Sequence, residues 1–159
     1  MSDIVKIWYG LLVKELYYQG AAVNALEMDR LIEQHLAAEH AGDADASVAV
    51  YTEDVEHDVV GAPHGPLQGR DAARGFYEQL NREVDTESMT ATRCYYGPDF
   101  CVTEHQWTGT VHGHFLGIPG NGRSVSIRML HVWEFADGRI SRENLWLDGG
   151  SAVAQLTAP

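Results

Sequence analysis

The feature that most constrains the fold is a run of strict alternation between residues 124 and 135. Apolar or aromatic side chains, with one histidine among them, occupy every second position, and the intervening set includes serine, arginine and glutamate. Because successive side chains of a β-strand point to opposite faces of a sheet, this run predicts a long strand with one buried face. The expected inward set is Val125, Ile127, Met129, His131, Trp133 and Phe135.

Helical spacing dominates the first half of the chain, and strand-like alternation dominates the second. The expected helices span residues 4–19, 23–41, 45–51 and 70–84. The expected strands span residues 55–60, 88–96, 100–111, 124–135 and 139–148, with turns at Gly97-Pro98-Asp99 and Ala136-Asp137-Gly138. Helices followed by an antiparallel meander predict an α+β fold, in which helices wrap a curved sheet and enclose a cone-shaped pocket.

The length of 159 residues and the hydrophobic content of 45% fit a single core. No internal repeat or long linker divides the chain, so one domain is expected over residues 23–159. Residues 1–22 are expected to form an amphipathic helical extension, which packs on the body, covers a pocket or contacts a second subunit. We expect a homodimer packed through the outer face of the sheet.

The charge balance excludes several classes of partner. Eleven Lys and Arg residues against 23 Asp and Glu give a net charge of −12, which opposes binding to nucleic acids and to acidic membranes. The apolar stretch Ile7–Val13 is far shorter than the roughly 20 residues of a spanning helix, and no signal-peptide cleavage site follows it. Cys94 and Cys101 make no disulfide framework, so reduced thiols in a cytoplasmic protein are expected.

The parity of the later strands predicts a pocket that can move protons. Its expected wall is aromatic and apolar and carries two imidazoles and one carboxylate. Such a wall suits the binding of a flat, conjugated substrate and the transfer of a proton on it. Desolvation raises the pKa of an Asp and lowers that of a His, so both types of side chain are expected to exchange protons near pH 7. The expected catalytic residues are Asp148, His131 and His105, and the expected substrate-binding residues on these strands are Trp107, Met129, Trp133, Asn144 and Trp146.

Two earlier segments add polar residues to this pocket. His35 lies on the inward stripe of the second helix, with Glu39 one turn later. His57 and Asp58 have opposite strand parities, and Asp58 is expected to face inward. The alternative at each position is structural: a hydrogen-bonded core histidine, an Asp bonded to backbone, a solvated strand face, or a tryptophan that only fills the core.

No motif for a metal or a cofactor is present. The pairs His112/His114 and His35/His40 lack the i,i+4 helical spacing and the third ligand of a zinc motif. The glycine-rich segment 117–122 joins two strands without a helix N-terminus that would hold a phosphate. No nucleophile motif is found either, so the site is expected to need neither cofactor nor metal.

Residues 114–123 and 131–148 resemble the nuclear transport factor 2-like superfamily and, within it, the SnoaL-like polyketide cyclases. The resemblance extends over about residues 25–156. Its motifs are Gly117-Ile118-Pro119, Gly122-Arg123, Asp137-Gly138-Arg139-Ile140, Asp148 and Gln155-Leu156. It implies a cone-shaped α+β barrel and assigns Asp148 as the acid/base of an intramolecular aldol ring closure. The chain departs from the family at Glu143-Asn144, where a His-Trp pair is usual.

Similarity to two further enzymes of the superfamily extends the list of site residues. Compared with ketosteroid isomerase, His35 stands at the oxyanion-hole tyrosine, Asp58 at the general base and His131 at the protonated aspartic acid. Compared with limonene epoxide hydrolase, His105 and Trp107 replace the Arg and Asp of the catalytic triad.

The sequence therefore predicts a cofactor-independent cyclase of secondary metabolism, of the lyase or isomerase class, acting on a small hydrophobic, polyketide-like substrate. The alternatives are an epoxide hydrolase, an isomerase or a dehydratase in the same pocket, or a protein that binds a small ligand without catalysis.

Overall fold

The computed structural model describes residues 24–158. The helix predicted over residues 4–19 lies outside this range. The described helices are α2 (Ala25–His40), α3 (Ala44–Val48), α4 (Arg70–Glu83) and α5 (Gly149–Thr157). The strands are β1 (Tyr51–Val59), β2 (Leu67–Gln68), β3 (Val84–Tyr96), β4 (Phe100–Val111), β5 (His114–Phe115), β6 (Ile118–Pro119), β7 (Arg123–Ala136) and β8 (Arg139–Leu147).

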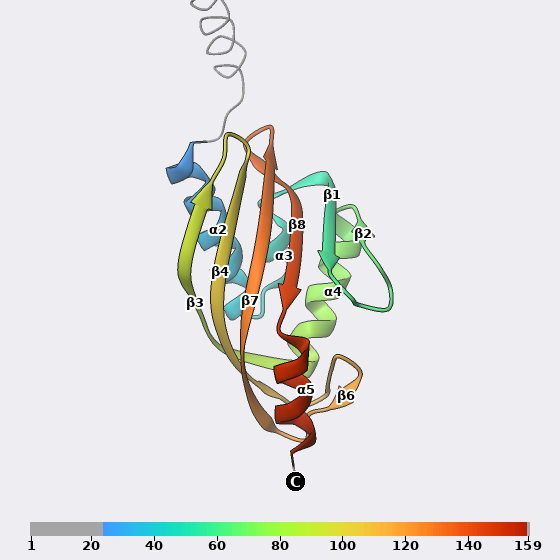
Figure 1. Ribbon diagram of the computed structural model, residues 1–159. Helices are drawn as coiled ribbons and strands as arrows, with labels where there is room; N and C mark the ends of the chain where they lie inside the picture. The colour runs from blue at the N-terminus through green and yellow to red at the C-terminus, as the bar shows by residue number, and fades with distance from the viewer. Residues whose placement is uncertain (1–23, 159) are drawn as a thin grey trace, which may run out of the picture.

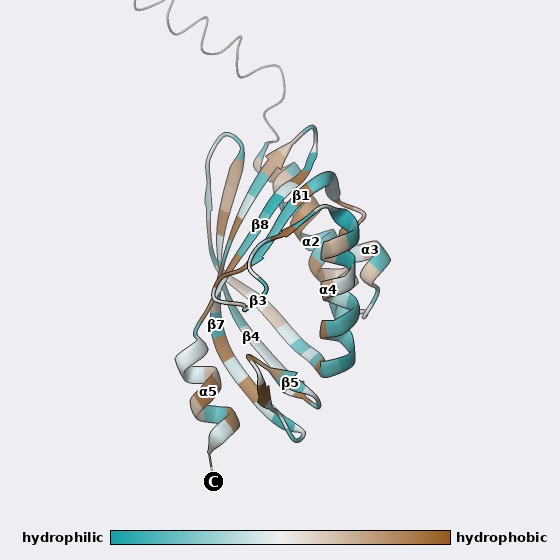
Figure 2. Cartoon of the chain, turned by 90° about the vertical axis from the view of Figure 1, so that its right-hand side faces the viewer, coloured by the Kyte–Doolittle hydropathy of each residue, from teal (hydrophilic) through white to brown (hydrophobic). Residues whose placement is uncertain are grey.

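The main sheet has six strands in the order β2-β1-β8-β7-β4-β3, so β2 and β3 are its edges and the sheet is not closed. It bends toward α2 and α4, which lie with α3 on one side of it (Figure 2). The helix α5 packs against β7, at the end of the sheet opposite the β3–β4 turn (Figure 1). The predicted α+β fold, a curved sheet covered by N-terminal helices, is confirmed.

One pairing departs from the expected antiparallel sheet. The strands β3, β4, β7 and β8 form the predicted meander, but β1 pairs with β8 in parallel. The chain between β1 and β8 includes α4 and the other three strands of the meander. After them, β8 lies beside β1. This return places side chains from both ends of the domain on the same part of the sheet.

Local sequence signals account for the helix boundaries. The side chain of Asn24 caps α2 by accepting a hydrogen bond from the backbone N–H of Glu27. Gly42 follows the helix with a φ of 70°, a left-handed conformation that glycine adopts without strain. The helix α4 runs directly into β3, so the strand begins at Val84 and not at the expected residue 88.

Two clusters of buried apolar residues form the core. The larger joins α2, α3 and α4 to the first parts of β1, β4 and β8 and the last part of β7: Met28, Leu31, Ile32, Ala44, Val48, Val50, Tyr51, Val55, Ala73, Tyr77, Cys101, Trp133, Phe135 and Ile140. The second lies toward α5: Val84, Trp107, Val111, Val125, Ile127, Met129, Ala152 and Leu156. All six residues of the predicted inward set of β7 are buried.

The two cysteines lie on neighbouring strands but do not face one another. Cys101 pairs with Tyr96 and Cys94 with Thr103 in the β3–β4 ladder, and both cysteines are free thiols. In the part of the chain that the structure describes, no helix is both long enough and apolar enough to cross a bilayer.

Candidate functional site

A buried carboxylate, that of Glu143, occupies the middle of the sheet face that the helices cover. Its residue is 2% exposed, and it pairs with Trp133 across the β7–β8 ladder. Tyr51 at the start of β1 and Tyr77 on α4 both donate hydrogen bonds to Oε2 of Glu143, the second at 3.0 Å. The hydroxyl groups of the two tyrosines also lie 3.0 Å apart.

Histidines from α2, β7 and β1 surround this carboxylate. Nε2 of His35 on α2 lies 3.5 Å from Oε2 of Glu143, and Nε2 of His131 on β7 lies 3.6 Å from Oε1. Nε2 of His57 on β1 is 3.1 Å from the hydroxyl of Tyr77. The charged group therefore has polar neighbours from both helices and strands. We call the set Tyr51, Tyr77, Glu143, His35, His57, His131 and His105 the polar cluster.

Hydrogen-bond partners fix the tautomer of His35. Its Nδ1 lies 2.8 Å from the backbone carbonyl of Ser47, which can only accept, so Nδ1 carries a proton. In the neutral ring, Nε2 is then the unprotonated nitrogen, and it faces the hydroxyl of Tyr77 at 3.2 Å. A second proton on this ring would enter at Nε2, beside Glu143.

His105 on β4 extends the polar cluster away from Glu143. Its Nδ1 lies 3.0 Å from Nδ1 of His131, so one of these nitrogens donates and the other accepts. When His131 holds its proton on Nε2, that proton points toward Glu143 and Nδ1 accepts from His105. The two rings thus continue the chain of polar groups from the carboxylate to the strand β4.

The groups of the polar cluster differ in their state of ionisation. Burial acts to raise the pKa of Glu143, the positive charge of His35, His57 or His131 in the protonated form acts to lower it, and so does the hydrogen bond from Tyr51; the result is a pKa below the ordinary value. Burial raises the pKa of both tyrosines well above their usual value, so they remain hydrogen-bond donors. Glu143 is therefore an ionised carboxylate in a dry environment.

Burial also keeps the histidines of the strands neutral. It lowers the pKa of His131 to about 3 and that of His105 to about 4, against a weaker opposing effect of Glu143. It lowers the pKa of His57 as well. Neutral imidazoles both donate and accept protons, which suits them to pass a proton along the cluster.

Aromatic rings pack around the histidines of the polar cluster. Trp133 stacks on His131 with ring centroids 4.9 Å apart, and His35 stacks on Tyr51 at 5.2 Å. Phe76 covers His57 at 4.5 Å. Such walls exclude water and strengthen every electrostatic interaction inside them.

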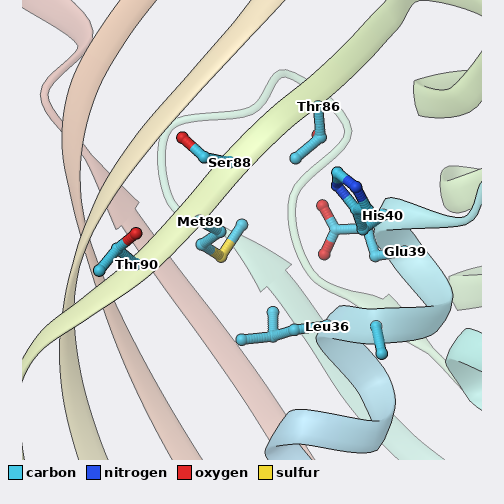
Figure 3. A pocket seen from close by; sticks show the side chains of 8 residues that line it. Leu36, Glu39, His40, Thr86, Ser88, Met89 and Thr90 are labelled. Carbon is cyan, nitrogen blue, oxygen red and sulfur yellow. The ribbon is translucent and has the colours of Figure 1, made fainter.

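A cleft of about 350 Å³ opens between α2 and the edge strand β3, beside the polar cluster (Figure 3). It is lined by Leu36, Ala37, Glu39, His40, Thr86, Ser88, Met89 and Thr90. Glu39 also approaches the cluster, because its Oε2 lies 3.8 Å from Nε2 of His35. Burial raises the pKa of Glu39 to about 7, with His35 lowering it and Glu143 raising it.

Several residues expected in the pocket do lie on the helix-covered face of the sheet. His35, His105 and His131 belong to the polar cluster, and Trp133 covers it. Trp107 and Met129 are buried in the second core cluster, next to it. These placements agree with the strand and helix parities that the sequence indicates; the roles of the residues stay predictions.

The inward orientation expected for Asp58, Asn144 and Trp146 is wrong. These three form a separate chain on the opposite face: Asn144 donates to Asp58 at 2.8 Å, and Nε1 of Trp146 donates to Asn144 at 2.6 Å. A register shift after Glu134 sets the parity of β8, so that Glu143 faces inward. In β1 the inward residue is accordingly His57, which is 1% exposed.

Asp148 lies outside the polar cluster. It directly follows β8 and caps α5, its Oδ1 accepting a hydrogen bond of 3.1 Å from the backbone N–H of Ser151. Its residue is half-buried. A capping role thus accounts for this side chain, and the acid/base role implied by the resemblance stays a prediction.

Sequence reasoning did not assign functional roles to Glu143, Tyr51, Tyr77 and His57. Tyr77 falls within the helix expected over residues 70–84, and the hydroxyl of a tyrosine that becomes buried signals that a polar partner must be near. Leu145 and Leu147 share the parity of Glu143, which is the one local signal for its orientation. Tyr51 gives no such signal, since it was expected at the end of a helix. Within residues 24–158, no three His, Cys, Asp or Glu side chains are arranged to hold a metal ion.

Solved structures with this fold come from several bacteria. TsrD from Streptomyces laurentii aligns with a TM-score of 0.74 at 22% identity, over 86% of this chain and 99% of that one. A protein of Xanthomonas campestris described as a candidate polyketide cyclase aligns at 0.72 and 24%, over 85% and 100%. An epoxide hydrolase of M. tuberculosis, described as LEH-like, aligns at 0.67 and 19%, over 82% and 90%. At these identities the likeness shows the fold.

No match was found among curated proteins. A sequence model of the SnoaL-like domain matches residues 32–143, which include β1, α4, β3, β4, β7 and most of α2 and β8. The matched part holds the whole polar cluster and ends at Glu143. Because the match covers most of the chain and agrees with the observed fold, the chain belongs to the SnoaL-like domain family.

Proposed function

We propose that this protein is a cofactor-independent acid/base enzyme that cyclises a small hydrophobic, polyketide-like substrate by an intramolecular aldol-type reaction. The observation that carries the proposal is the buried, ionised carboxylate of Glu143 among two tyrosine hydroxyls and neutral histidines. Burying a charge is costly, and a buried ionisable group among proton donors is a common feature of catalytic sites. In this proposal the negative charge that drives proton removal is that of Glu143, whereas the resemblance gives the acid/base role to Asp148.

The reaction needs only the transfer of protons. A base removes a proton next to a carbonyl group, the resulting enolate carbon attacks a second carbonyl of the same molecule, and a proton returns to the new alkoxide. No oxidant or cofactor is consumed. The ionised Glu143 supplies the basic charge, and the histidines store and pass protons.

A second reaction class is supported more weakly. The epoxide hydrolase of M. tuberculosis shares the fold, and a carboxylate among tyrosines could activate water on an epoxide. However, His105 and Trp107 stand where the resemblance has the Arg and Asp of the epoxide-opening triad. We therefore place cyclisation first.

The test is a turnover screen of the purified chain, read by mass spectrometry, against aromatic polyketide esters, terpene epoxides and conjugated enones. Cyclisation is expected to give a product of altered retention and unchanged or dehydrated mass from a polyketide ester. Glu143→Gln should abolish it, whereas Glu33→Gln, which changes an exposed carboxylate on α2, should retain it. Unchanged turnover in Glu143→Gln refutes this mechanism, and binding without any product identifies a ligand carrier.

We further propose that the protein is a cytoplasmic homodimer that packs through the outer face of its sheet. Trp146 supports this because it is 53% exposed on that face, beside the polar pair Asp58 and Asn144. An exposed tryptophan on the open face of a sheet is typical of an interface residue. Light scattering should give the mass of a dimer for the wild type and of a monomer for Trp146→Glu; a monomeric wild type refutes the proposal.

A further inference from the structure

Among residues 24–158, Glu39 is the one carboxylate that belongs both to the cleft and to the surroundings of the polar cluster. Its side chain is 10% exposed and lines the cleft between α2 and β3, where Figure 3 places it close to His40 and across from Thr86. Glu143, by contrast, has a side chain that is 3% exposed and does not line this cleft. A molecule held in the cleft would therefore meet Glu39 first.

Nε2 of His35 lies between these two carboxylates. It is 3.8 Å from Oε2 of Glu39 and 3.5 Å from Oε2 of Glu143. The other ring nitrogen is held by the carbonyl of Ser47, so any additional proton on His35 must sit on Nε2, within reach of both carboxylates. One imidazole nitrogen thus connects the buried charge with the cleft.

We propose that Glu39 is the catalytic residue that exchanges a proton with a substrate in this cleft, and that His35 passes the proton between Glu39 and the buried Glu143. This inference rests on the proposed function and deepens it, since it names the place of the substrate and the group that meets it. His35 and Glu143 act through Glu39 and are positioning residues in this scheme.

The proton balance closes over the three side chains and the substrate. In one arrangement Glu39 is protonated, His35 is neutral and Glu143 is ionised. Moving the proton from Glu39 to Nε2 gives an imidazolium between two carboxylates, with the same total charge. From this second arrangement the ionised Glu39 takes a proton from a substrate carbon and then gives a proton to the alkoxide of the product, which restores the starting state, while Glu143 stabilises the imidazolium.

The lining of the cleft indicates the class of ligand. Leu36 and Met89 face one another across it, and Thr86 lies across it from Glu39 (Figure 3). Among the residues that the structure describes, no basic side chain other than His40 lines it, so these residues offer an anionic ligand little charge to bind. The cleft fits a neutral, mostly apolar molecule with a carbonyl oxygen that accepts a hydrogen bond from protonated Glu39.

The electrostatic surroundings of Glu39 support the proposed exchange. The titratable groups that face it are His35 and His40 of α2, Tyr77 of α4 and Glu143 of β8. Burial and Glu143 raise its pKa, and His35 lowers it, to about 7 in total. Near neutral pH, Glu39 therefore populates both protonation states, as an acid/base group requires.

The experiment is chemical labelling of the full chain with dicyclohexylcarbodiimide, an apolar reagent that adds only to protonated carboxyl groups. The carboxyl oxygen bonds to the carbodiimide carbon, the proton goes to nitrogen, and the adduct rearranges to a stable N-acylurea on the glutamate. Peptide mass spectrometry then locates it. We expect Glu39 to be labelled at pH 7 and labelling to fall roughly tenfold per pH unit well above 7.

Variants test the connection to the cluster, with folding checked by circular dichroism. Glu143→Gln removes a negative charge and should lower the pH at which half the labelling of Glu39 is lost. His35→Gln removes the opposing group and should raise it, so the inference is testable when only one of the two variants folds. Glu33→Gln, on the exposed side of α2, is the control and should leave the midpoint unchanged.

The outcomes separate this inference from the proposed function. No labelling of Glu39 at pH 7, or the same midpoint in the wild type and in the cluster variants, overturns the inference whatever the turnover screen gives. A screen without any product overturns the proposed function even when the labelling follows the expected pattern. Where a substrate is found, Glu39→Gln should lower kcat at least tenfold and remove the pH dependence near 7.

Discussion

Replacing Glu39 with glutamine is expected to change how the stability of the fold depends on pH. Burial raises the pKa of this carboxyl from 4.5 to about 7 in the folded chain. The folded state therefore holds the proton more tightly than the unfolded state does. This contribution to stability is fully present below about pH 4.5 and is lost as the pH rises to about 7. Glutamine resembles the protonated acid and does not titrate.

The size of the effect follows from the two pKa values. Each pKa unit corresponds to about 1.4 kcal/mol, so a difference of about 2.5 between the folded and unfolded states is worth about 3 kcal/mol. Glu39→Gln should thus be more stable than the wild type by about 1 kcal/mol at pH 5 and by about 3 kcal/mol at pH 8. The side chain is only 10% exposed, so solvent screening takes little of this away.

Urea denaturation followed by tryptophan fluorescence at pH 5, 6, 7 and 8 measures this difference. The other titrating groups are common to both proteins, so they cancel in the comparison to first order. Glu33→Gln, on the exposed side of the same helix, serves as the matched control and should stay within about 0.5 kcal/mol of the wild type at each pH. Parallel stability curves for Glu39→Gln and the wild type would refute the reasoning.

Other substitutions probe the cluster and its surroundings by the same denaturation assay. Tyr51→Phe removes a donor to Glu143 and should cost about 1.5–3 kcal/mol, whereas Tyr95→Phe at an exposed site should cost less than about 0.5; equal effects contradict the cluster geometry. His131, with a pKa of about 3, must stay neutral in the fold, so the wild type should lose about 3 kcal/mol from this group between pH 6.5 and 4.5. His131→Asn should remove that loss, and an unchanged acid profile argues against a neutral His131. Asp148→Ala should cost about 1 kcal/mol as a lost helix cap, and Asp148→Asn almost nothing; an Asn variant that keeps its stability but loses turnover would show that Asp148 is catalytic.

Much of the architecture could be predicted because its signals are local. The alternation of β7 indicates its buried face, and the helical stripe of α2 places His35 and Glu39 inward. The turn at 97–99 sets the start of β4 at Phe100, as observed. In each case a single short stretch of sequence contains the whole pattern, so no knowledge of distant segments is needed.

The orientation of β8 shows where such signals end. Both parities of this strand contain polar and apolar residues, and the register shift after Glu134 changes which of them faces the helices. A pattern of period two offers two faces but does not state which one is buried. The expected set with Asn144 and Trp146 was therefore wrong, and with it the expected orientation of Asp58 on the neighbouring strand.

The sequence by itself determined the α+β class, the order of the longer helices and strands as far as β8, and the inward orientation of His35, His105 and His131. Only the tertiary structure decided that the buried charge belongs to Glu143. A carboxylate can be buried and ionised only where several donors meet it, and here the donors come from β1 and α4, with histidines from α2, β1 and β7 around them. Those segments are far apart along the chain, and only the parallel return of β8 beside β1 brings them to one point.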